Sequence, residues 1–217
     1  MGELLPARLP VHGFVLAGGK SSRMGEDKAL LRFCGRPMVE IAVEKLRGFC
    51  AEVTIAGNRE DLGEFAPVVR ETRVDVGPAA GIEAGLMSAS EEWALFMPVD
   101  VPLIPKVLLR RWAEAVLRMD GLVASNLHHG RDQPAFCMHP RDCKTRFSEG
   151  LDAGERRLGL LLGRASEGYE RTFSLDMLYE ANDPGPEIGD KWFMNVNTPE
   201  DLAEAEGWAR AGGLGGR

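Results

Sequence analysis

Short apolar runs alternate along the chain with segments in which apolar residues recur every three or four positions. The first half holds four runs that we predict to be buried parallel strands: residues 13–17, 53–56, 67–69 and 93–97. Helical spacing marks three other segments: residues 38–49, 82–89 and 105–117. Pro37 stands where it would open the first of these helices. The alternation predicts an α/β fold, a Rossmann-like and mostly parallel sheet with helices on both faces.

The second half of the chain has a less regular pattern. Residues 122–124 and 134–138 are strand candidates, the second of them a candidate antiparallel strand, and residues 192–194 are a last apolar strand candidate. Helical spacing returns around 142–147 and 155–162. Thr198-Pro199-Glu200-Asp201 combines an N-cap residue, a first-turn proline and a carboxylate at the third helical position, which predicts the start of a helix.

Neither an internal repeat nor a linker divides the chain. We therefore predict an N-terminal tail over residues 1–11, a single domain over 12–210 with an irregular C-terminal half, and a disordered glycine-rich tail over 211–217. The chain has 217 residues, of which 44% are apolar and 27% charged, and this composition excludes bulk disorder.

Charge and cysteine usage narrow the function classes further. A net charge of −7 and a pI near 5.2 argue against a general nucleic-acid-binding surface. The first eleven residues lack an apolar signal core and no run of 18 apolar residues occurs, so we expect a soluble cytoplasmic protein without a membrane span. The four cysteines lack C-x-x-C spacing and the histidines are not spaced with them as zinc ligands, which favours buried structural thiols.

A glycine-containing basic loop, residues 16–28, follows the first predicted strand, where open α/β sheets place ligands. It is not a P-loop, because that motif needs glycine at position 14 and Phe14 stands there; the G-x-G-x-x-G dinucleotide motif is also absent. Residues 1–48 nevertheless hold eight Lys and Arg against five Asp and Glu. Free backbone N–H groups and these cations suit a triphosphate, whereas the alternative is a strand-to-helix turn with solvated charges.

The loop resembles the signature of the nucleotidyltransferase family that contains the molybdenum cofactor guanylyltransferases, in the pattern Leu16-Ala17-Gly18-Gly19-x-Ser21-x-Arg23-Met24-Gly25-x-Asp27-Lys28. The resemblance continues in family order, over roughly residues 12–208, through Gly77-Pro78-Ala79-Ala80-Gly81, Pro98-Val99-Asp100-Val101-Pro102, Gly154-Glu155-Arg156-Arg157 and Asn195-Val196-Asn197-Thr198-Pro199-Glu200-Asp201-Leu202. Sugar-nucleotide and cytidylyl-transferring relatives more often carry Leu-Ala-Ala-Gly, so Gly18 points to the guanylyl branch.

The resemblance implies a nucleotidyltransferase-type fold and a set of nucleotide-binding residues: Leu16, Ala17, Gly18, Gly19, Lys28, Glu71, Gly81 and Asp100. It also implies that Arg23, Lys28 and Asp100 are catalytic, with Mg²⁺ as cofactor on Asp100. From local sequence alone, Asp100 could equally be a turn residue between two prolines.

Two positions depart from the family pattern. Relatives tend to have an aspartate near position 71, where this chain has Glu71, with Asp75 as the rival. Relatives also often have asparagine at position 56, whereas this chain has Ala56, followed by Asn58 and Arg59. The second departure removes one side-chain contact to the nucleotide but leaves the phosphate site intact.

The second substrate is implied by the C-terminal motifs. By resemblance, Arg156, Asn195 and Asn197 bind molybdopterin, whose polar ring and phosphate suit guanidinium and amide groups. From local sequence alone, Arg156 and Arg157 would be solvated residues at the start of a helix, and Asn197 would be a helix-capping residue. The stripe of Leu158, Leu161 and Leu162 has the spacing of core residues.

The resemblance implies transfer of GMP from GTP to molybdenum-molybdopterin, which gives molybdopterin guanine dinucleotide and pyrophosphate. A cytidylyl-transferring enzyme of the same superfamily is one alternative, and a nucleotide- or cofactor-binding partner without turnover is another. Expected partners are GTP and molybdopterin, together with molybdoenzymes or other cofactor-biosynthesis proteins, but neither nucleic acid nor membrane. We expect a monomer.

Overall fold

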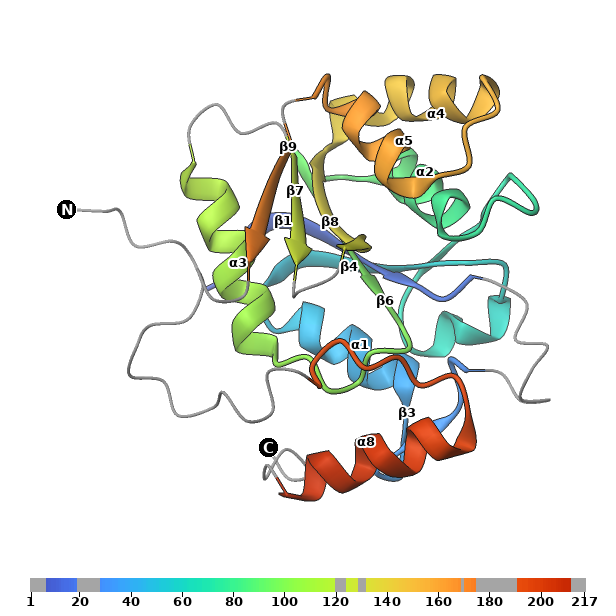
Figure 1. Ribbon diagram of the computed structural model, residues 1–217, viewed down its shortest axis with the longest axis vertical. Coiled ribbons are helices and arrows are strands. Elements are labelled where there is room, and N and C mark those ends of the chain that lie inside the picture. The colour runs from blue at the N-terminus through green and yellow to red at the C-terminus, as the bar shows by residue number, and fades with distance from the viewer. Residues whose placement is uncertain are drawn as a thin grey trace.

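The computed structural model describes residues 7–18, 28–119, 124–128, 132–168, 170–174 and 191–211. Within these residues seven strands form one sheet in the order β5-β4-β1-β6-β8-β7-β9 (Figure 1). Their bounds are β1 Leu9–Leu16, β4 Cys50–Ala56, β5 Val68–Val69, β6 Trp93–Pro98, β7 Ala124–His128, β8 Asp132–Pro140 and β9 Glu170–Ser174. Only β8 runs antiparallel to its neighbours in this sheet. The predicted mostly parallel sheet is confirmed, and so is the antiparallel candidate at 134–138.

Helices cover both faces of the sheet, as predicted (Figure 1). Their bounds are α1 Met38–Arg47, α2 Pro78–Ser88, α3 Lys106–Arg118, α4 Lys144–Asp152, α5 Leu158–Ala165 and α8 Pro199–Ala211, with short 3₁₀ turns η1 Glu60–Glu64 and η2 Arg141–Cys143. Helices α1, α3 and α8 pack on one face, and α2, α4 and α5 on the other. Along β1, Val11 and Val15 face the first layer while Phe14 and Leu16 face the second, because side chains alternate along a strand.

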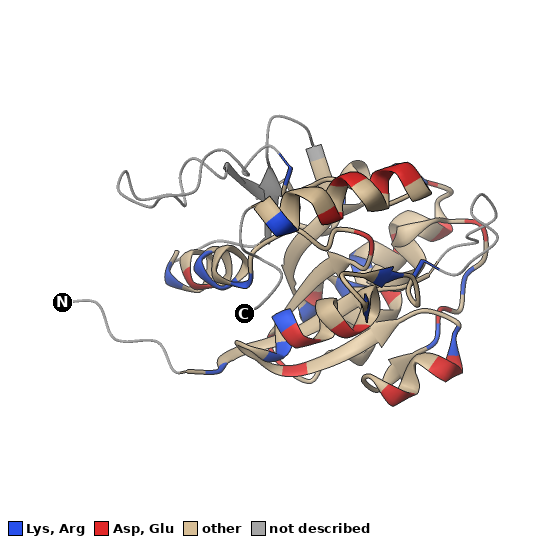
Figure 2. Cartoon of the chain, turned by 90° about the horizontal axis from the view of Figure 1, so that it is seen from below, with Lys and Arg blue, Asp and Glu red and all other residues tan. Residues whose placement is uncertain are grey.

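The start of α8 has the predicted capping arrangement. The Thr198 hydroxyl accepts a hydrogen bond from the Asp201 amide at 3.1 Å, and the Asp201 carboxylate accepts one from the Thr198 amide at 2.8 Å. Glu200 and Asp201 lie in the first turn and Arg210 in the last, which is the charge order that the helix dipole favours (Figure 2). These bonds fix the direction in which the chain leaves the segment at 195–197.

Three predicted boundaries differ from the structure. Strand β1 begins at Leu9, so the predicted N-terminal tail over 1–11 was too long; Leu9 and Val11 are fully buried in the sheet. Pro37 is the N-cap of α1 rather than its first helical residue, and it also ends β3 (Arg36–Pro37), which pairs with β2 (Arg32–Phe33) in a small hairpin. Helix α8 extends through Ala211, and the rest of the predicted tail, 212–217, lies outside the described residues.

The predicted strand at 192–194 was wrong. Trp192 and Phe193 lie in a turn, and both are buried against the α1–α3 layer. Phe193 meets Phe136 of β8 edge to face, with ring centroids 5.1 Å apart. Their apolar character therefore reflects side-chain packing rather than membership of the sheet.

The prediction that the cysteines are buried structural thiols is confirmed at three of the four positions. Cys50, Cys137 and Cys143 are buried free thiols, whereas Cys34 is exposed at the tip of the β2–β3 hairpin. Among the helices that the structure describes, none is long and apolar enough to cross a membrane.

His139 on β8 makes stability sensitive to acid. Its side chain is fully buried and both ring nitrogens lack a hydrogen-bond partner among the described residues. Burial lowers the pKa of His139 from 6.5 to about 3. Below pH 6.5, His139 therefore binds a proton in the unfolded chain but stays neutral in the folded chain. The free energy of unfolding consequently decreases as the pH falls from 6.5 toward 3.

We expect His139→Leu to flatten this acid loss. Between pH 6.5 and about pH 5, the wild-type protein should lose about 1.6 kcal/mol of unfolding free energy through His139 alone, and the variant should not. Urea unfolding at several pH values measures the difference. His12, whose pKa burial also lowers, stays in both proteins, so parallel pH curves for the two would contradict the assignment.

Candidate active site

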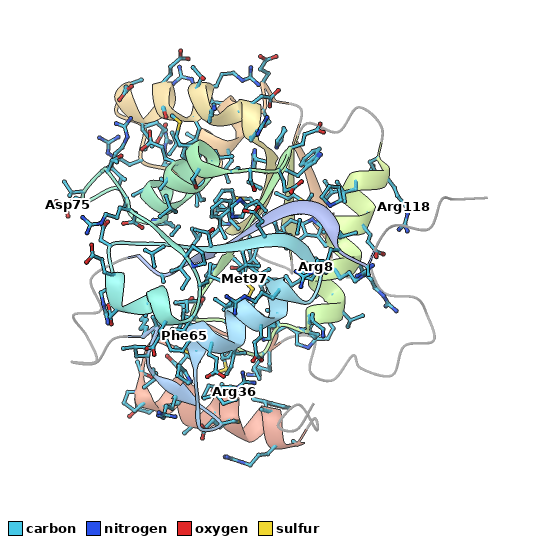
Figure 3. All side chains as sticks on the ribbon, turned by 180° about the vertical axis from the view of Figure 1, so that it is seen from behind. Arg8, Arg36, Phe65, Asp75, Met97 and Arg118 are labelled. Carbon is cyan, nitrogen blue, oxygen red and sulfur yellow. The ribbon has the colours of Figure 1, made fainter. Side chains whose placement is uncertain are left out.

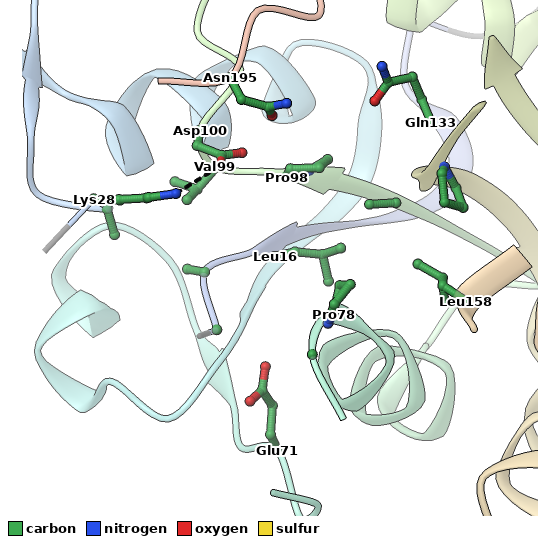
Figure 4. Close-up of a pocket in the computed structure, with 16 residues that line it drawn as sticks. Leu16, Lys28, Glu71, Pro78, Pro98, Val99, Asp100, Gln133, Leu158 and Asn195 are labelled. Carbon is green, nitrogen blue, oxygen red and sulfur yellow. Dashed lines mark hydrogen bonds and ion pairs between the residues drawn. The ribbon is translucent and has the colours of Figure 1, made fainter. Parts of the chain in front are cut away.

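The sheet topology defines where a ligand can bind. From β1 the chain moves outward to β4 and β5, then returns to form β6 on the other side of β1. Open α/β sheets bind ligands at such a reversal, outside the carboxyl ends of the strands. A cavity of about 470 Å³ lies at this edge, and both Leu16 at the end of β1 and Pro98 at the end of β6 line it (Figure 4).

Charged groups gather at one end of this cavity (Figure 4). The Lys28 ammonium lies 3.4 Å from a carboxylate oxygen of Asp100 and also donates to the Asn197 side-chain oxygen. Their sequence positions span 169 residues, so the fold brings the basic loop, the end of β6 and the segment before α8 together. The Lys28 and Asp100 side chains are 28% and 20% exposed, which leaves both accessible to a ligand.

Backbone hydrogen bonds hold Asp100 in place. The Val99 amide donates to the Leu16 carbonyl at 3.1 Å, and the Val196 amide donates to the Asp100 carbonyl at 2.8 Å. The first bond aligns the end of β6 with the end of β1. The second brings the neighbouring Asn195 to the cavity wall.

A second carboxylate, Glu71, lies at another side of the cavity, against the glycine loop. A Cβ atom added to Gly18 would stand 1.9 Å from the Glu71 Oε1 atom, so a larger residue at position 18 would have to displace this carboxylate. Gly81 on α2 is also close, since an added Cβ would stand 3.2 Å from the same oxygen. Burial raises the pKa of Glu71.

The structure separates the two rival carboxylates. Glu71 lines the cavity, whereas Asp75 is exposed at the outer part of the loop between β5 and α2 (Figure 3). The Glu71 amide donates to the Asn58 side-chain oxygen at 3.1 Å, so Asn58 helps to place Glu71. Ala56 is fully buried at the end of β4, so no polar side chain from that position reaches the cavity.

The amino end of α2 forms the next part of the wall. Gly77 and Pro78 line the cavity, and Gly77 has a φ of 60°, a left-handed conformation that glycine adopts without strain. The predicted small-residue segment 77–81 therefore does border the cavity. Its backbone is accessible there, because no atom of the described residues, apart from the glycine and its chain neighbours, lies within 4 Å of a Cβ added at Gly77.

The opposite wall contains residues that the sequence analysis did not select: Gln133, Pro134, Ala135 and Leu158. Because β8 is antiparallel, its first residues lie beside the carboxyl end of β6, with Phe96 facing Cys137 in the register. An antiparallel strand at 134–138 was therefore the signal that could have pointed to Gln133. Leu158 was assigned to the core; it is half-buried and borders the cavity, whereas Leu161 and Leu162 are fully buried.

The three predicted molybdopterin-binding residues do not all lie at the cavity. Asn195 lines the cavity and Asn197 contacts Lys28. Arg156 does not line the cavity; its guanidinium donates to the Leu151 and Glu155 carbonyls at the turn before α5. Gly19 and Arg23 lie outside the described residues, so their roles stay predictions.

The donor chemistry fits a magnesium ion that shares its ligands with a substrate. No group of three or more His, Cys, Asp or Glu residues within the described ranges could hold a metal by itself. Asp100 offers one accessible carboxylate, beside the Asn195 and Asn197 amides. Magnesium is commonly held by one or two carboxylates together with substrate phosphates and water.

Known proteins resemble this chain in sequence and in fold. The MobA-like NTP transferase domain model matches residues 13–166. The molybdenum cofactor guanylyltransferase of Vibrio cholerae is 35% identical over 195 residues, which are 88% of each chain. Among solved structures, molybdopterin-guanine dinucleotide biosynthesis protein A from Archaeoglobus fulgidus superposes with a TM-score of 0.70 at 21% identity, over 92% of this chain and 99% of the other. CMP:2-keto-3-deoxy-manno-octonic acid synthetase complexed with CTP gives 0.68 at 14% identity, over 93% and 99%.

Proposed function

Because the chain belongs to the MobA-like NTP transferase family, we propose that it transfers GMP from GTP to molybdenum-molybdopterin. An oxygen of the acceptor phosphate attacks the α-phosphorus of GTP. The bond from that phosphorus to the β-phosphate oxygen breaks, and pyrophosphate leaves with the bonding electrons. The products are molybdopterin guanine dinucleotide and pyrophosphate. We also propose that the protein is a monomer, that it acts in the cytoplasm, and that its product is passed on to molybdoenzymes.

The observation that carries this proposal is the position of the Lys28 ammonium between Asp100 and Asn197. Asp100 follows β6 in the nucleotide half of the cavity, and Asn197 belongs to the segment assigned to the acceptor. A reaction between two phosphates needs both anions in one place, with positive charge where they meet. Lys28 supplies that charge, and Arg23 and the backbone amides of Gly18 and Gly19 add to it.

Magnesium enters the proposal through Asp100, with the Asn195 and Asn197 amides nearby to orient water or phosphate. When bound, the ion neutralises phosphate charge and polarises the α-phosphate. The chain itself positions the two substrates: Lys28 holds phosphate oxygens on one side and keeps Asn197 directed at the acceptor on the other. None of these residues needs to become covalently modified.

Glu71 gives a physical reason for selecting guanine. Burial makes an ionised Glu71 carboxylate unfavourable unless hydrogen-bond donors reach it. The edge of guanine supplies two such donors, the N1–H and N2–H groups. Cytosine and adenine offer no such pair of adjacent donors. A flat base could approach Glu71 from the cavity, where Gly77 at the start of α2 has open space beside it.

We expect Glu71→Gln to weaken GTP binding by about 10- to 100-fold, because a hydrogen bond to a charged group contributes about 1.5–3 kcal/mol. CTP and ATP binding should change little. Calorimetric titration with GTP, CTP and ATP in excess Mg²⁺ measures this, with Glu64→Gln as the control, since Glu64 is exposed on η1. Wild-type protein that binds CTP as tightly as GTP would instead support the cytidylyl alternative.

A further inference from the structure

An ion-pair network outside the cavity joins helix α4 to two elements that border the cavity, the β5–α2 segment and α2. Arg73 Nε donates to the Glu83 carboxylate at 2.7 Å, and Arg73 Nη1 lies 2.8 Å from the Asp152 carboxylate. The Ser148 hydroxyl donates to the other Glu83 oxygen at 2.6 Å. Glu83 belongs to α2, whereas Ser148 and Asp152 belong to α4, so one guanidinium ties the β5–α2 segment to two helices.

The burial of this network is uneven. The Glu83 side chain is only 8% exposed, so both of its oxygens depend on the bonds from Arg73 and Ser148. The Asp152 side chain is 66% exposed and sits at the end of α4. Arg73 thus has one buried partner, which fixes its position, and one solvated partner, which links it to α4.

The segment that carries Arg73 has few other anchors. Residues 70–76 make no backbone–backbone hydrogen bond in the part of the chain that the structure describes. The Glu71 amide is held by the Asn58 side chain, and Val76 packs against the α2–α4–α5 layer. Glu71, near the start of this segment, and Gly77, which directly follows it, both line the cavity. Arg73 is therefore the main polar tether between them.

We infer that Arg73 is a positioning residue for the nucleotide: through Glu83 and Asp152 it holds Glu71 and the amino end of α2 at the spacing that the base requires. This inference rests on the proposed function for the identity of the nucleotide, but the tether itself does not. Arg73 contacts Glu83 and Asp152, and neither residue belongs to the phosphate-binding or acceptor segments. A change at Arg73 should therefore alter the affinity for the nucleotide rather than the rate of the chemical step.

The test measures binding of a non-hydrolysable GTP analogue with Mg²⁺ by calorimetry, together with KM for GTP, turnover and the unfolding temperature. We expect Arg73→Gln to raise the dissociation constant and KM at least about tenfold, with turnover at saturating GTP within about threefold. Arg73→Lys, which retains a charge for Glu83, should recover most of the affinity. Arg70→Gln is the matched control, since Arg70 lies in the same segment but pairs with exposed Glu60 at the surface.

Two outcomes overturn the inference. One is a folded Arg73→Gln protein that binds the analogue as tightly as the wild type. The other is an equal loss of affinity in Arg70→Gln. If Arg73→Gln does not fold, Asp152→Asn removes only the solvated partner and should still raise the dissociation constant about two- to fivefold; unchanged affinity there also refutes the tether. A wild-type protein that binds another nucleotide instead of GTP refutes the proposed function, and the same variants then test the tether with that nucleotide.

Discussion

Replacing Asp100 with asparagine should lower turnover by about 10²- to 10³-fold, even in excess Mg²⁺. The variant keeps the shape and hydrogen-bonding capacity of the side chain but removes the negative charge. That charge faces Lys28 and offers the accessible carboxylate at this end of the cavity. GTP affinity should fall less than turnover, because the base and the remaining phosphate contacts are intact. Steady-state rates against Mg²⁺ concentration, with calorimetry for GTP, separate the two effects.

Asp142→Asn is the control for this variant, because Asp142 is exposed on η2 and does not line the cavity. It should retain wild-type rates and metal dependence. Near-normal turnover of the Asp100→Asn protein, with an unchanged dependence on Mg²⁺, would show that Asp100 is only a turn residue between Pro98 and Pro102.

Lys28→Ala should lower kcat/KM for GTP by about 10²-fold and should also raise the concentration of molybdopterin required. The first effect follows from the loss of a positive charge at the phosphates. The second follows from the contact with Asn197, since the same ammonium also orients the acceptor segment. Asn197→Ala should raise only the molybdopterin requirement. Initial rates with each substrate varied in turn distinguish these two patterns.

The control for Lys28 is Lys191→Ala, which removes an exposed ammonium that pairs with Glu204 on α8. It should leave both substrate requirements unchanged. A Lys28→Ala protein with normal GTP affinity would contradict a phosphate-binding role, and one with a normal molybdopterin requirement would contradict the link through Asn197.

The sequence predicted the first half of the fold well because its signals are local. The apolar runs at 13–17, 53–56, 67–69 and 93–97 coincide with β1, β4, β5 and β6, and such runs can be recognised without knowledge of the neighbouring strands. The glycine loop and Asp100 could be placed at the same edge for this reason alone, since parallel strands end there together. Their roles came from the resemblance rather than from spacing.

The parts that were missed depend on long-range packing. Strand β9 (Glu170–Ser174) carries a polar sequence and is fixed by its parallel pairing with β7, which no local pattern reveals. Trp192 and Phe193 have the composition of a strand but fill space beside Phe136. Gln133 reaches the cavity only because β8 runs against β6. Arg73 is an unremarkable loop residue until Glu83 and Asp152 are brought to it by the fold.

The fold also does not determine which nucleotide base the protein selects. A protein of the same fold that was solved with CTP superposes on this chain nearly as well as the Archaeoglobus fulgidus protein does, with TM-scores of 0.68 and 0.70. We therefore expect selectivity for the base to come from side chains such as Glu71, rather than from the arrangement of strands and helices.

The central claim is acceptor-dependent guanylyl transfer, and pyrophosphate release tests it most directly. Purified protein with Mg²⁺ is incubated with GTP, CTP or ATP, each with and without molybdenum-molybdopterin, and the pyrophosphate is quantified. The account predicts release with GTP that requires the acceptor and matches the guanine dinucleotide formed, with far less from CTP or ATP. Equal or greater release with CTP, or saturable GTP binding with no acceptor-dependent pyrophosphate, would contradict it.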